Sequence, residues 1–241
     1  MRDRGIESAW VCLSCALLMA AAWPCEAADR KTYDPGLGTL PEAQGFAAYD
    51  TGEPVCTIQG GAMHQGLTSW NGQQWWESQT IPMDFDVGAV MEADLKIISS
   101  TYSTSSGYEV AGWGMALSDA SRRAFHVFIS SDRICAWSSP GVDTGSIPFD
   151  STDDFHHYRF VVTDGAGSLF IDGAPDPFLS LPVGVVWYTD ANRAVFGDGT
   201  GFGQNESLLR SFSYLNVPEP ATLGLLGVGA CLALRVRRKR K

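Results

Sequence analysis

The stretch that decides the fold is DFHHYRFVVTDGAGSLFIDG, Asp154 to Gly173. Two runs rich in aromatic and β-branched residues flank Asp164-Gly165-Ala166-Gly167, and an Asp-Gly pair between such runs predicts a β-hairpin. Successive side chains of a strand point to opposite faces, so His156 and His157 are expected on opposite faces and cannot easily bind one metal ion. An antiparallel sheet is therefore predicted here.

Similar short strands recur along the chain. In AVMEADLKI, residues 89–97, apolar residues alternate with Glu92, Asp94 and Lys96, which predicts one buried and one solvated face. EVAGWGMALS, AFHVFIS, RICAWSS, RAVFGD and SLLRSFSYL supply further strands. Because no long helix pattern occurs between the chain ends, residues 45–216 are predicted to form an all-β antiparallel sandwich after an irregular lead-in at residues 28–44.

The hairpin resembles one in the concanavalin A-like, or laminin-G-like, jelly rolls, with Phe155 where tryptophan is usual. Two further segments are similar to the central sheet and closing strand of that family: Gly112–Asp119 with the strand Phe125–Ile129, and Phe196–Asp198 with Ser211–Leu215. The resemblance implies a jelly roll over roughly Gly45 to Leu215.

The first 27 residues are typical of a signal peptide. Arg2 and Arg4 precede an apolar run over residues 9–23, and Cys25-Glu26-Ala27 fits a cleavage site before Ala28. A membrane anchor is the alternative, but the run is shorter than the roughly 18 to 20 apolar residues that span a bilayer. Lipoprotein processing at Cys25 is disfavoured, because Ala-Trp-Pro precedes it.

The chain ends in a second targeting pattern. Val217-Pro218-Glu219-Pro220 precedes an apolar segment at residues 221–234 and a basic end with Arg235, Arg237 and Arg238. As a helix, residues 221–236 would measure ~24 Å, short of a ~30 Å hydrocarbon core, but snorkelling side chains and local thinning allow a transmembrane helix. The basic end predicts a cytoplasmic terminus; a terminal helix packed on the domain is the alternative.

The order of Pro-Glu-Pro motif, apolar segment and basic end resembles the PEP-CTERM sorting signal of Gram-negative bacteria. The resemblance implies residues 217–241 as the signal, export machinery and an exosortase as partners, and cleavage near Pro-Glu-Pro by that membrane cysteine protease-transpeptidase. The membrane-anchored intermediate would then yield a protein at the cell surface or in extracellular polysaccharide. The two prolines keep the motif extended and out of the following helix.

The composition of the chain between the two targeting segments limits its possible partners. Without leader and tail, nine basic and 23 acidic residues remain, a formal charge of −14, which disfavours nucleic acid as a partner. Two cysteines remain, Cys56 and Cys135. In an exported protein they are candidates for one disulfide; two separate buried thiols are the alternative.

Three tryptophans are the candidates for binding carbohydrate. Trp70, Trp75 and Trp76 lie in WNGQQWW, a polar stretch that we interpret as turn-like. Indole faces and amide donors can hold a sugar ring, and at least one of the adjacent indoles must point outward if the segment is extended. The alternative is that these indoles cap the core.

The sequence supports catalysis and metal binding less strongly than it supports carbohydrate binding. Glycosidases of the resembled superfamily use Glu-x-Asp-x-x-Glu; here Glu92 and Asp94 fit, but Ile97 occupies the last position. No catalytic residue and no cofactor are assigned, except that calcium could bind at Asp84 and Asp86, expected on one strand face, or at Asp198. The favoured function is a non-catalytic surface module; a glycan hydrolase and a purely structural protein are the alternatives.

Overall fold

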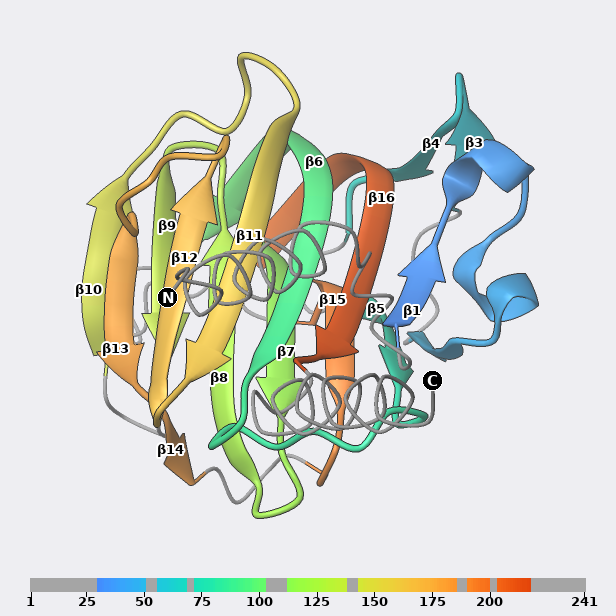
Figure 1. The fold of residues 1–241 in the computed structure, drawn as a ribbon. Coiled ribbons are helices and arrows are strands. Elements are labelled where there is room, and N and C mark those ends of the chain that lie inside the picture. Colours follow the sequence, from blue (N-terminus) through green and yellow to red (C-terminus); the bar gives the residue numbers. More distant parts are fainter. Residues whose placement is uncertain are drawn as a thin grey trace, which may run out of the picture. The chain divides into compact units, whose positions relative to one another are not determined.

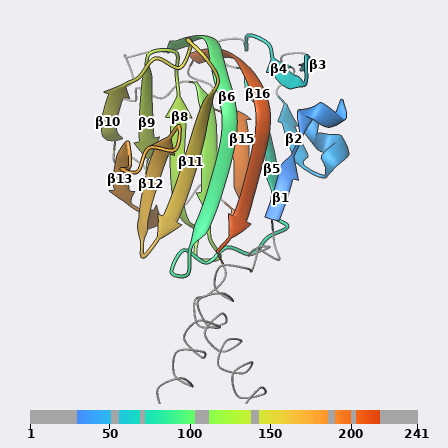
Figure 2. The same cartoon turned by 45° about the horizontal axis from the view of Figure 1, so that its top comes forward.

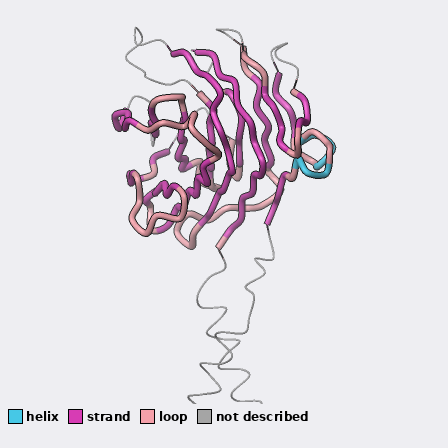
Figure 3. Tube along the Cα trace, turned by 90° about the horizontal axis from the view of Figure 1, so that it is seen from above, coloured by secondary structure: helices cyan, strands magenta, loops and turns pink. Residues whose placement is uncertain are grey.

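The computed structural model describes residues 30–50, 56–68, 72–102, 112–137, 143–185, 190–199 and 203–217. These residues form two antiparallel sheets packed face to face, an all-β sandwich (Figure 1). The two layers of strands and the short helical segment beside them are visible in Figure 3. The compact unit spans Asp29–Val217.

The first sheet, sheet A, has the strand order β13-β12-β11-β6-β16-β4-β3, and β1 also pairs with β16. Its strands are β1 (Arg30–Tyr33), β3 (Thr57–Gln59), β4 (Ala62–Gln65), β6 (Ala89–Tyr102), β11 (His156–Thr163), β12 (Ala166–Ile171), β13 (Leu179–Pro182) and β16 (Gly203–Asn216).

The second sheet, sheet B, has the order β10-β9-β8-β7-β15-β5-β2, and β14 pairs with β8. Its strands are β2 (Ala47–Asp50), β5 (Gln74–Ser78), β7 (Trp113–Ser118), β8 (Arg123–Ile129), β9 (Arg133–Trp137), β10 (Asp143–Pro148), β14 (Gly184–Val185) and β15 (Ala194–Asp198).

The long strands β6 and β16 form the centre of sheet A. They run beside each other from Gly203 opposite Tyr102 to Asn216 opposite Ala89 (Figure 2). Arg30 of β1 pairs with Leu215 on the other side of β16. The described body therefore begins and ends on neighbouring strands.

The predicted hairpin is confirmed as β11 and β12. Asp164 and Gly165 connect them with φ of 50° and 74°, and Thr163 pairs with Ala166. Positive φ at both central residues is the type I′ geometry that matches the twist of a two-residue hairpin. The alternation in β6 is also confirmed, because the apolar residues 89, 91, 93, 95 and 97 are all fully buried.

An aromatic cluster centred on Phe196 of β15 fills the space between the sheets. Its ring stacks on Phe212 of β16 with centroids 4.1 Å apart and on Trp76 of β5 at 5.5 Å. Tyr33 of β1 stacks on the same ring at 5.9 Å, and Phe46 meets it edge-on at 5.3 Å. Burial of several aromatic rings is the main stabilising contribution here, each worth about 1.5–3 kcal/mol for a side chain the size of phenylalanine.

The structure corrects three sequence predictions. The lead-in is not irregular, because β1 and two short 3-10 helices, η1 (Pro35–Leu37) and η2 (Pro41–Gln44), lie within residues 30–44. The segment 74–78 is strand β5 rather than a turn. Asp84 and Asp86 do not share a strand face: they lie in a turn in which the Asp84 carboxylate accepts the Asp86 N–H.

Within the part of the chain that the structure describes, no helix has the length and apolar character needed to cross a membrane. The predicted signal peptide and the predicted transmembrane segment at residues 221–236 fall outside the described residues.

A glycine in β12 makes room for an aromatic ring of the opposite sheet. A Cβ at Gly167 would lie 2.6 Å from the ring of Phe125, which itself stacks on Phe160 with centroids 4.6 Å apart. Gly167→Ala is therefore expected to lower the free energy of unfolding by about 1–3 kcal/mol through overpacking. Urea unfolding measures it, with Ala166→Ser at the neighbouring exposed position as the control; equal stability of the two variants would contradict this packing.

Candidate functional site

The outer face of sheet B carries aromatic side chains on both sides of a strip of small residues. Two rows of paired residues cross the strands. We call their ten residues the aromatic face. The first row is Phe128, Gly114, Gly197, Trp75 and Tyr49; the second is Trp137, His126, Ala116, Val195 and Glu77.

Trp75 and Tyr49 form one side of the aromatic face. Their rings meet edge-on with centroids 5.3 Å apart, and Tyr49 is 48% exposed. The Arg193 guanidinium carbon lies 4.2 Å from the centroid of the Trp75 ring, and Arg193 Nε donates to Glu77 at 2.6 Å. The cation–π contact and the ion pair fix the orientation of the indole.

Phe128 and Trp137 form the other side. Their ring centroids are 5.3 Å apart in an edge-on arrangement, and His126 lies 6.2 Å from Phe128. Trp137 and His126 are partly exposed, whereas Phe128 is 8% exposed. This cluster is separate from the main core.

Gly197, in the strip between the two sides, is glycine for steric reasons. It has φ of 117°, and a Cβ there would lie 2.7 Å from the Gln74 carbonyl oxygen. At Gly114 a Cβ would make only an ordinary contact, 3.5 Å from the Phe128 ring. Phe128 and Trp75 are three strand steps apart, or roughly 14 Å at ~4.8 Å per step. No side chain longer than valine rises between them in these rows.

The aromatic face is close to neutral in charge. Burial, together with the charge of Arg193, lowers the pKa of His126 to about 4, so the imidazole is neutral at ordinary pH. Glu77 and Arg193 compensate each other. On the central strands β8, β7 and β15, the outward positions hold no carboxylate in the described residues.

The three predicted carbohydrate-binding tryptophans do not act together. Trp75 belongs to the aromatic face, as the alternation along β5 requires. Trp76 points into the core, where it is 1% exposed and stacks on Phe196. Trp70 lies outside the described residues.

The outer face of sheet A carries several ion pairs, and its aromatics Phe155 and Phe170 lie under arginines. Glu92 pairs with Arg30 at 2.9 Å and with Arg159 at 3.4 Å. Asp94 binds His157 Nδ1 and the Ser211 hydroxyl, each at 2.7 Å. This arrangement places the acid between serine and histidine, whereas an activated serine nucleophile needs the histidine in the middle.

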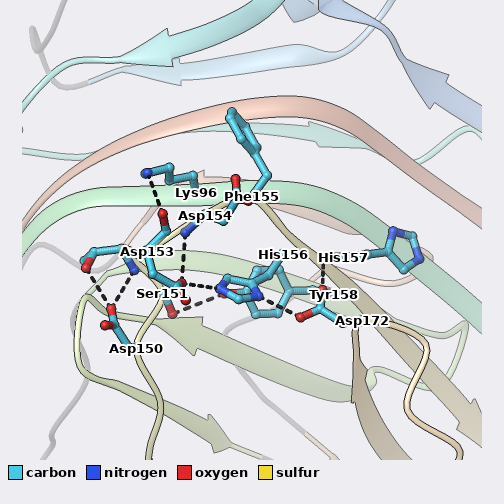
Figure 4. Close-up of polar contacts among 11 residues, drawn as sticks. Lys96, Asp150, Ser151, Asp153, Asp154, Phe155, His156, His157, Tyr158 and Asp172 are labelled. Atoms are coloured by element: carbon cyan, nitrogen blue, oxygen red, sulfur yellow. Dashed lines mark hydrogen bonds and ion pairs between the residues drawn. The ribbon is translucent and has the colours of Figure 1, made fainter.

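His156 is held between two carboxylates at the edge of the sandwich (Figure 4). Its Nε2 lies 2.7 Å from Asp153 and its Nδ1 lies 2.7 Å from Asp172. Burial opposes its charge, but the hydrogen bonds to Asp172 and Asp153 outweigh burial and raise the pKa of His156. His157 points the other way, toward Asp94, as the alternation predicts.

This contact joins the hairpin to the loop that precedes it. Asp153 precedes β11, and Asp172 follows β12. The Asp153 carbonyl accepts from Lys96 of β6 at 3.1 Å, and the Tyr158 hydroxyl donates to Ser151 at 3.1 Å (Figure 4). The cluster therefore ties the hairpin to the preceding loop and to β6.

The calcium candidates are not gathered into one site. Asp86 accepts a hydrogen bond from Arg123 at 2.6 Å, which lowers the pKa of Asp86, and Asp84 binds the Asp86 N–H. Asp198 is fully buried and accepts from the Thr68 hydroxyl at 2.6 Å. Among the described residues, no three acidic, histidine or cysteine side chains are grouped as metal ligands.

The predicted disulfide is not present. Cys56 and Cys135 are both buried thiols, and Cys56 Sγ donates to the Gln74 side chain of β5 at 2.9 Å. Cys135 lies in β9, four strand steps from β5 across sheet B. At ~4.8 Å per step the two thiols are far beyond the ~7 Å Cα separation that a disulfide allows.

Comparison with known protein families identifies the end of the chain. Residues 216–239 match the model described as the PEP-CTERM protein-sorting motif. The chain carries that sorting motif. It indicates an exported protein that is sorted to the cell surface and processed by an exosortase. Val217 is the last described residue; Pro218, Glu219, Pro220, Arg235, Arg237 and Arg238 lie outside the described part.

Solved structures show what the body of the chain is similar to. A carbohydrate esterase from the Shiga toxin-encoding bacteriophage phi24B has a TM-score of 0.54 at 15% identity, covering 77% of this chain and 97% of its own. A Bacillus subtilis protein with a galectin-like fold has a TM-score of 0.52 at 13% identity, covering 78% and 96%. No curated protein matches the sequence. At these identities the likeness shows the jelly-roll-like fold alone.

Sequence reasoning missed most of the aromatic face. Phe128, Trp137 and His126 belong to strands that were predicted, but their meeting with Trp75 depends on the order of strands across sheet B. The alternation in AFHVFIS, which places Ala124, His126 and Phe128 on one face, was the available signal.

The contact of His156 makes stability depend on pH. The folded-state pKa of His156 lies above the ordinary 6.5. The contribution of this contact to the free energy of unfolding is therefore complete below pH 6.5 and is lost as the pH rises through the folded-state pKa. His156→Gln is expected to lower the free energy of unfolding by about 1.5–3 kcal/mol at pH 6 and by less at pH 9. Urea unfolding at both pH values tests this; a difference between wild type and variant that is independent of pH would contradict it.

Proposed function

We propose that this PEP-CTERM protein is an exported surface module that binds a carbohydrate chain on its aromatic face without cleaving it. Its partners in sorting are the export machinery and an exosortase. Before processing, the membrane is a further partner, through the C-terminal segment. The extracellular polysaccharide is the proposed ligand. The observation that carries the proposal is the pair of aromatic clusters on either side of the glycine strip.

The chemistry of this face suits sugars. Partly exposed indole rings such as Trp75 and Trp137 can stack on the C–H faces of pyranoses, while Glu77 and Arg193 offer polar groups beside Trp75. The strip of Gly114, Gly197 and Ala116 places no long side chain between the two aromatic clusters. A neutral face favours a neutral polysaccharide over a uronic acid polymer.

The absence of outward carboxylates on β8, β7 and β15 supports binding over hydrolysis. Glycosidases need two carboxyl groups roughly 5–9.5 Å apart, one of them able to protonate the leaving oxygen. Glu92 and Asp94 lie on the opposite outer face, where Glu92 is ion-paired with two arginines. A hydrolase acting through Glu92 is the competing function.

Removing the Trp75 ring tests the proposal. Trp75→Ala is expected to weaken binding of neutral oligosaccharides about tenfold, because a stacked ring contributes about 1.4 kcal/mol. A glycan array followed by isothermal titration measures this. Phe155→Ala is the matched control, since that aromatic lies under Arg210 on sheet A, with 3.5 Å between ring centroid and guanidinium.

Three outcomes would contradict the proposal. The first is no binding to any glycan, which leaves the purely structural protein. The second is equal loss in the two variants. The third is release of reducing ends from β-glucans that Glu92→Gln abolishes, which would establish the hydrolase instead.

A further inference from the structure

One arginine on the outer face of sheet A has no carboxylate partner. Arg30 and Arg159 of this face are ion-paired with Glu92. Arg210 of β16 is exposed, and among the described residues its guanidinium contacts an aromatic ring and no acid. The charge of Arg210 is therefore available to a ligand.

A β-bulge turns Arg210 toward the outer face. The register of β16 against β6 shifts between Leu209 and Ser211, so the strand contains one extra residue at this point. Leu209 is fully buried, whereas Ser211 bonds Asp94 on the outer face. Arg210 and Ser211 thus both lie outside, where regular alternation would allow only one of them. Bulges of this kind re-aim a side chain and are frequent beside functional sites.

The ring of Phe155 fixes the position of the Arg210 guanidinium. Phe155 directly precedes β11, and β6 lies between β11 and β16. The guanidinium carbon is 3.5 Å from the centre of the ring, so the Arg210 side chain reaches across β6. Contact with a ring uses none of the five N–H donors of a guanidinium. The donors are therefore free to bind an anion, and a side chain that is already positioned loses less entropy on binding.

Lys96 of β6 supplies a second cation beside this ring. His156 pairs with Leu95, so Phe155 stands next to Lys96 on the neighbouring strand (Figure 4). The Lys96 ammonium donates to the Asp153 carbonyl oxygen at 3.1 Å. An ammonium has three donors, so Lys96 keeps N–H groups for a ligand that contacts Arg210.

The acids near these two cations are engaged elsewhere. Asp94 accepts hydrogen bonds from two side chains of the same face, each at 2.7 Å. Asp153 is bonded to His156, and Asp154 accepts the N–H of the next residue. In the described part of the chain, none of the three acids forms an ion pair with either cation. Arg210 and Lys96 are therefore not neutralised by direct contact.

We propose that Arg210 and Lys96 form a site for the carboxylate of an acidic sugar residue on the outer face of sheet A. A guanidinium fork matches a carboxylate with two parallel hydrogen bonds, and a second cation strengthens the contact. The sorting motif indicates export to the cell surface, where uronic acid polymers carry such carboxylates. The site lies on the sheet opposite the aromatic face and does not rest on carbohydrate binding there.

Isothermal titration with an oligogalacturonide tests the site. The wild type is expected to bind, and Arg210→Gln is expected to weaken binding about 10- to 100-fold through loss of a charge-assisted hydrogen-bonded pair. Binding should also weaken as the salt concentration rises. Arg122→Gln is the matched control, because it removes an exposed arginine from the turn before β8 of sheet B, and its affinity should equal that of the wild type.

Replacing the ring tests its role as a support. Phe155→Leu keeps both cations but removes the contact that positions the guanidinium, so it is expected to weaken oligogalacturonide binding about two- to fivefold. Unchanged affinity in this variant would show that the ring does not prepare Arg210 for binding.

Two further ligands separate the sources of the signal. The methyl ester of the same oligosaccharide lacks the charge and is expected not to bind, and inorganic phosphate is expected to bind more weakly than the sugar acid. Arg210→Gln should leave neutral oligosaccharide binding on the aromatic face unchanged, so the two proposals fail separately. No binding of the acid at low salt, equal affinities of Arg210→Gln and Arg122→Gln, or binding of phosphate alone would overturn the site.

Discussion

The packing of the two sheets through the Phe196 cluster is the interaction on which the other features depend. The Phe196 ring of sheet B stacks on Trp76 of the same sheet and on Phe212 and Tyr33 of sheet A. Because side chains alternate along a strand, turning Phe196 and Trp76 inward turns Gly197 and Trp75 outward. The same constraint that closes the core therefore creates half of the aromatic face.

The two outer faces of the sandwich differ in chemistry. Sheet A presents ion pairs such as Glu92 with Arg30 and His157 with Asp94, which suit a surface in contact with water. Sheet B presents aromatic rings and small residues, with its one described acid at these rows compensated by Arg193. A sandwich with one solvated and one aromatic face is suited to holding a ligand on the latter. The last strand of sheet A leads directly to the sorting motif, so the proposed carbohydrate site and the sorting signal belong to different parts of the chain.

The sequence predicted the elements whose pattern is local. The hairpin at Asp164-Gly165 and the alternation in β6 follow from turn chemistry and the period of a strand. Strand β5 was missed because polar Gln74 and Ser78 occupy inward positions, which hides the alternation. Their partners come from distant residues: the Tyr214 hydroxyl donates to Ser78 at 2.6 Å, and Cys56 donates to Gln74. Pairing of the cysteines and assembly of the aromatic face depend on strand order, which no short stretch encodes.

The most direct test of carbohydrate binding on sheet B follows the tryptophan indole N–H signals by NMR during titration with a neutral oligosaccharide that binds in an array. The account predicts that the signals of Trp75 and Trp137 shift on binding while those of the core residues Trp76 and Trp113 stay in place. Unchanged Trp75 and Trp137 signals at a saturating concentration of that oligosaccharide would contradict it.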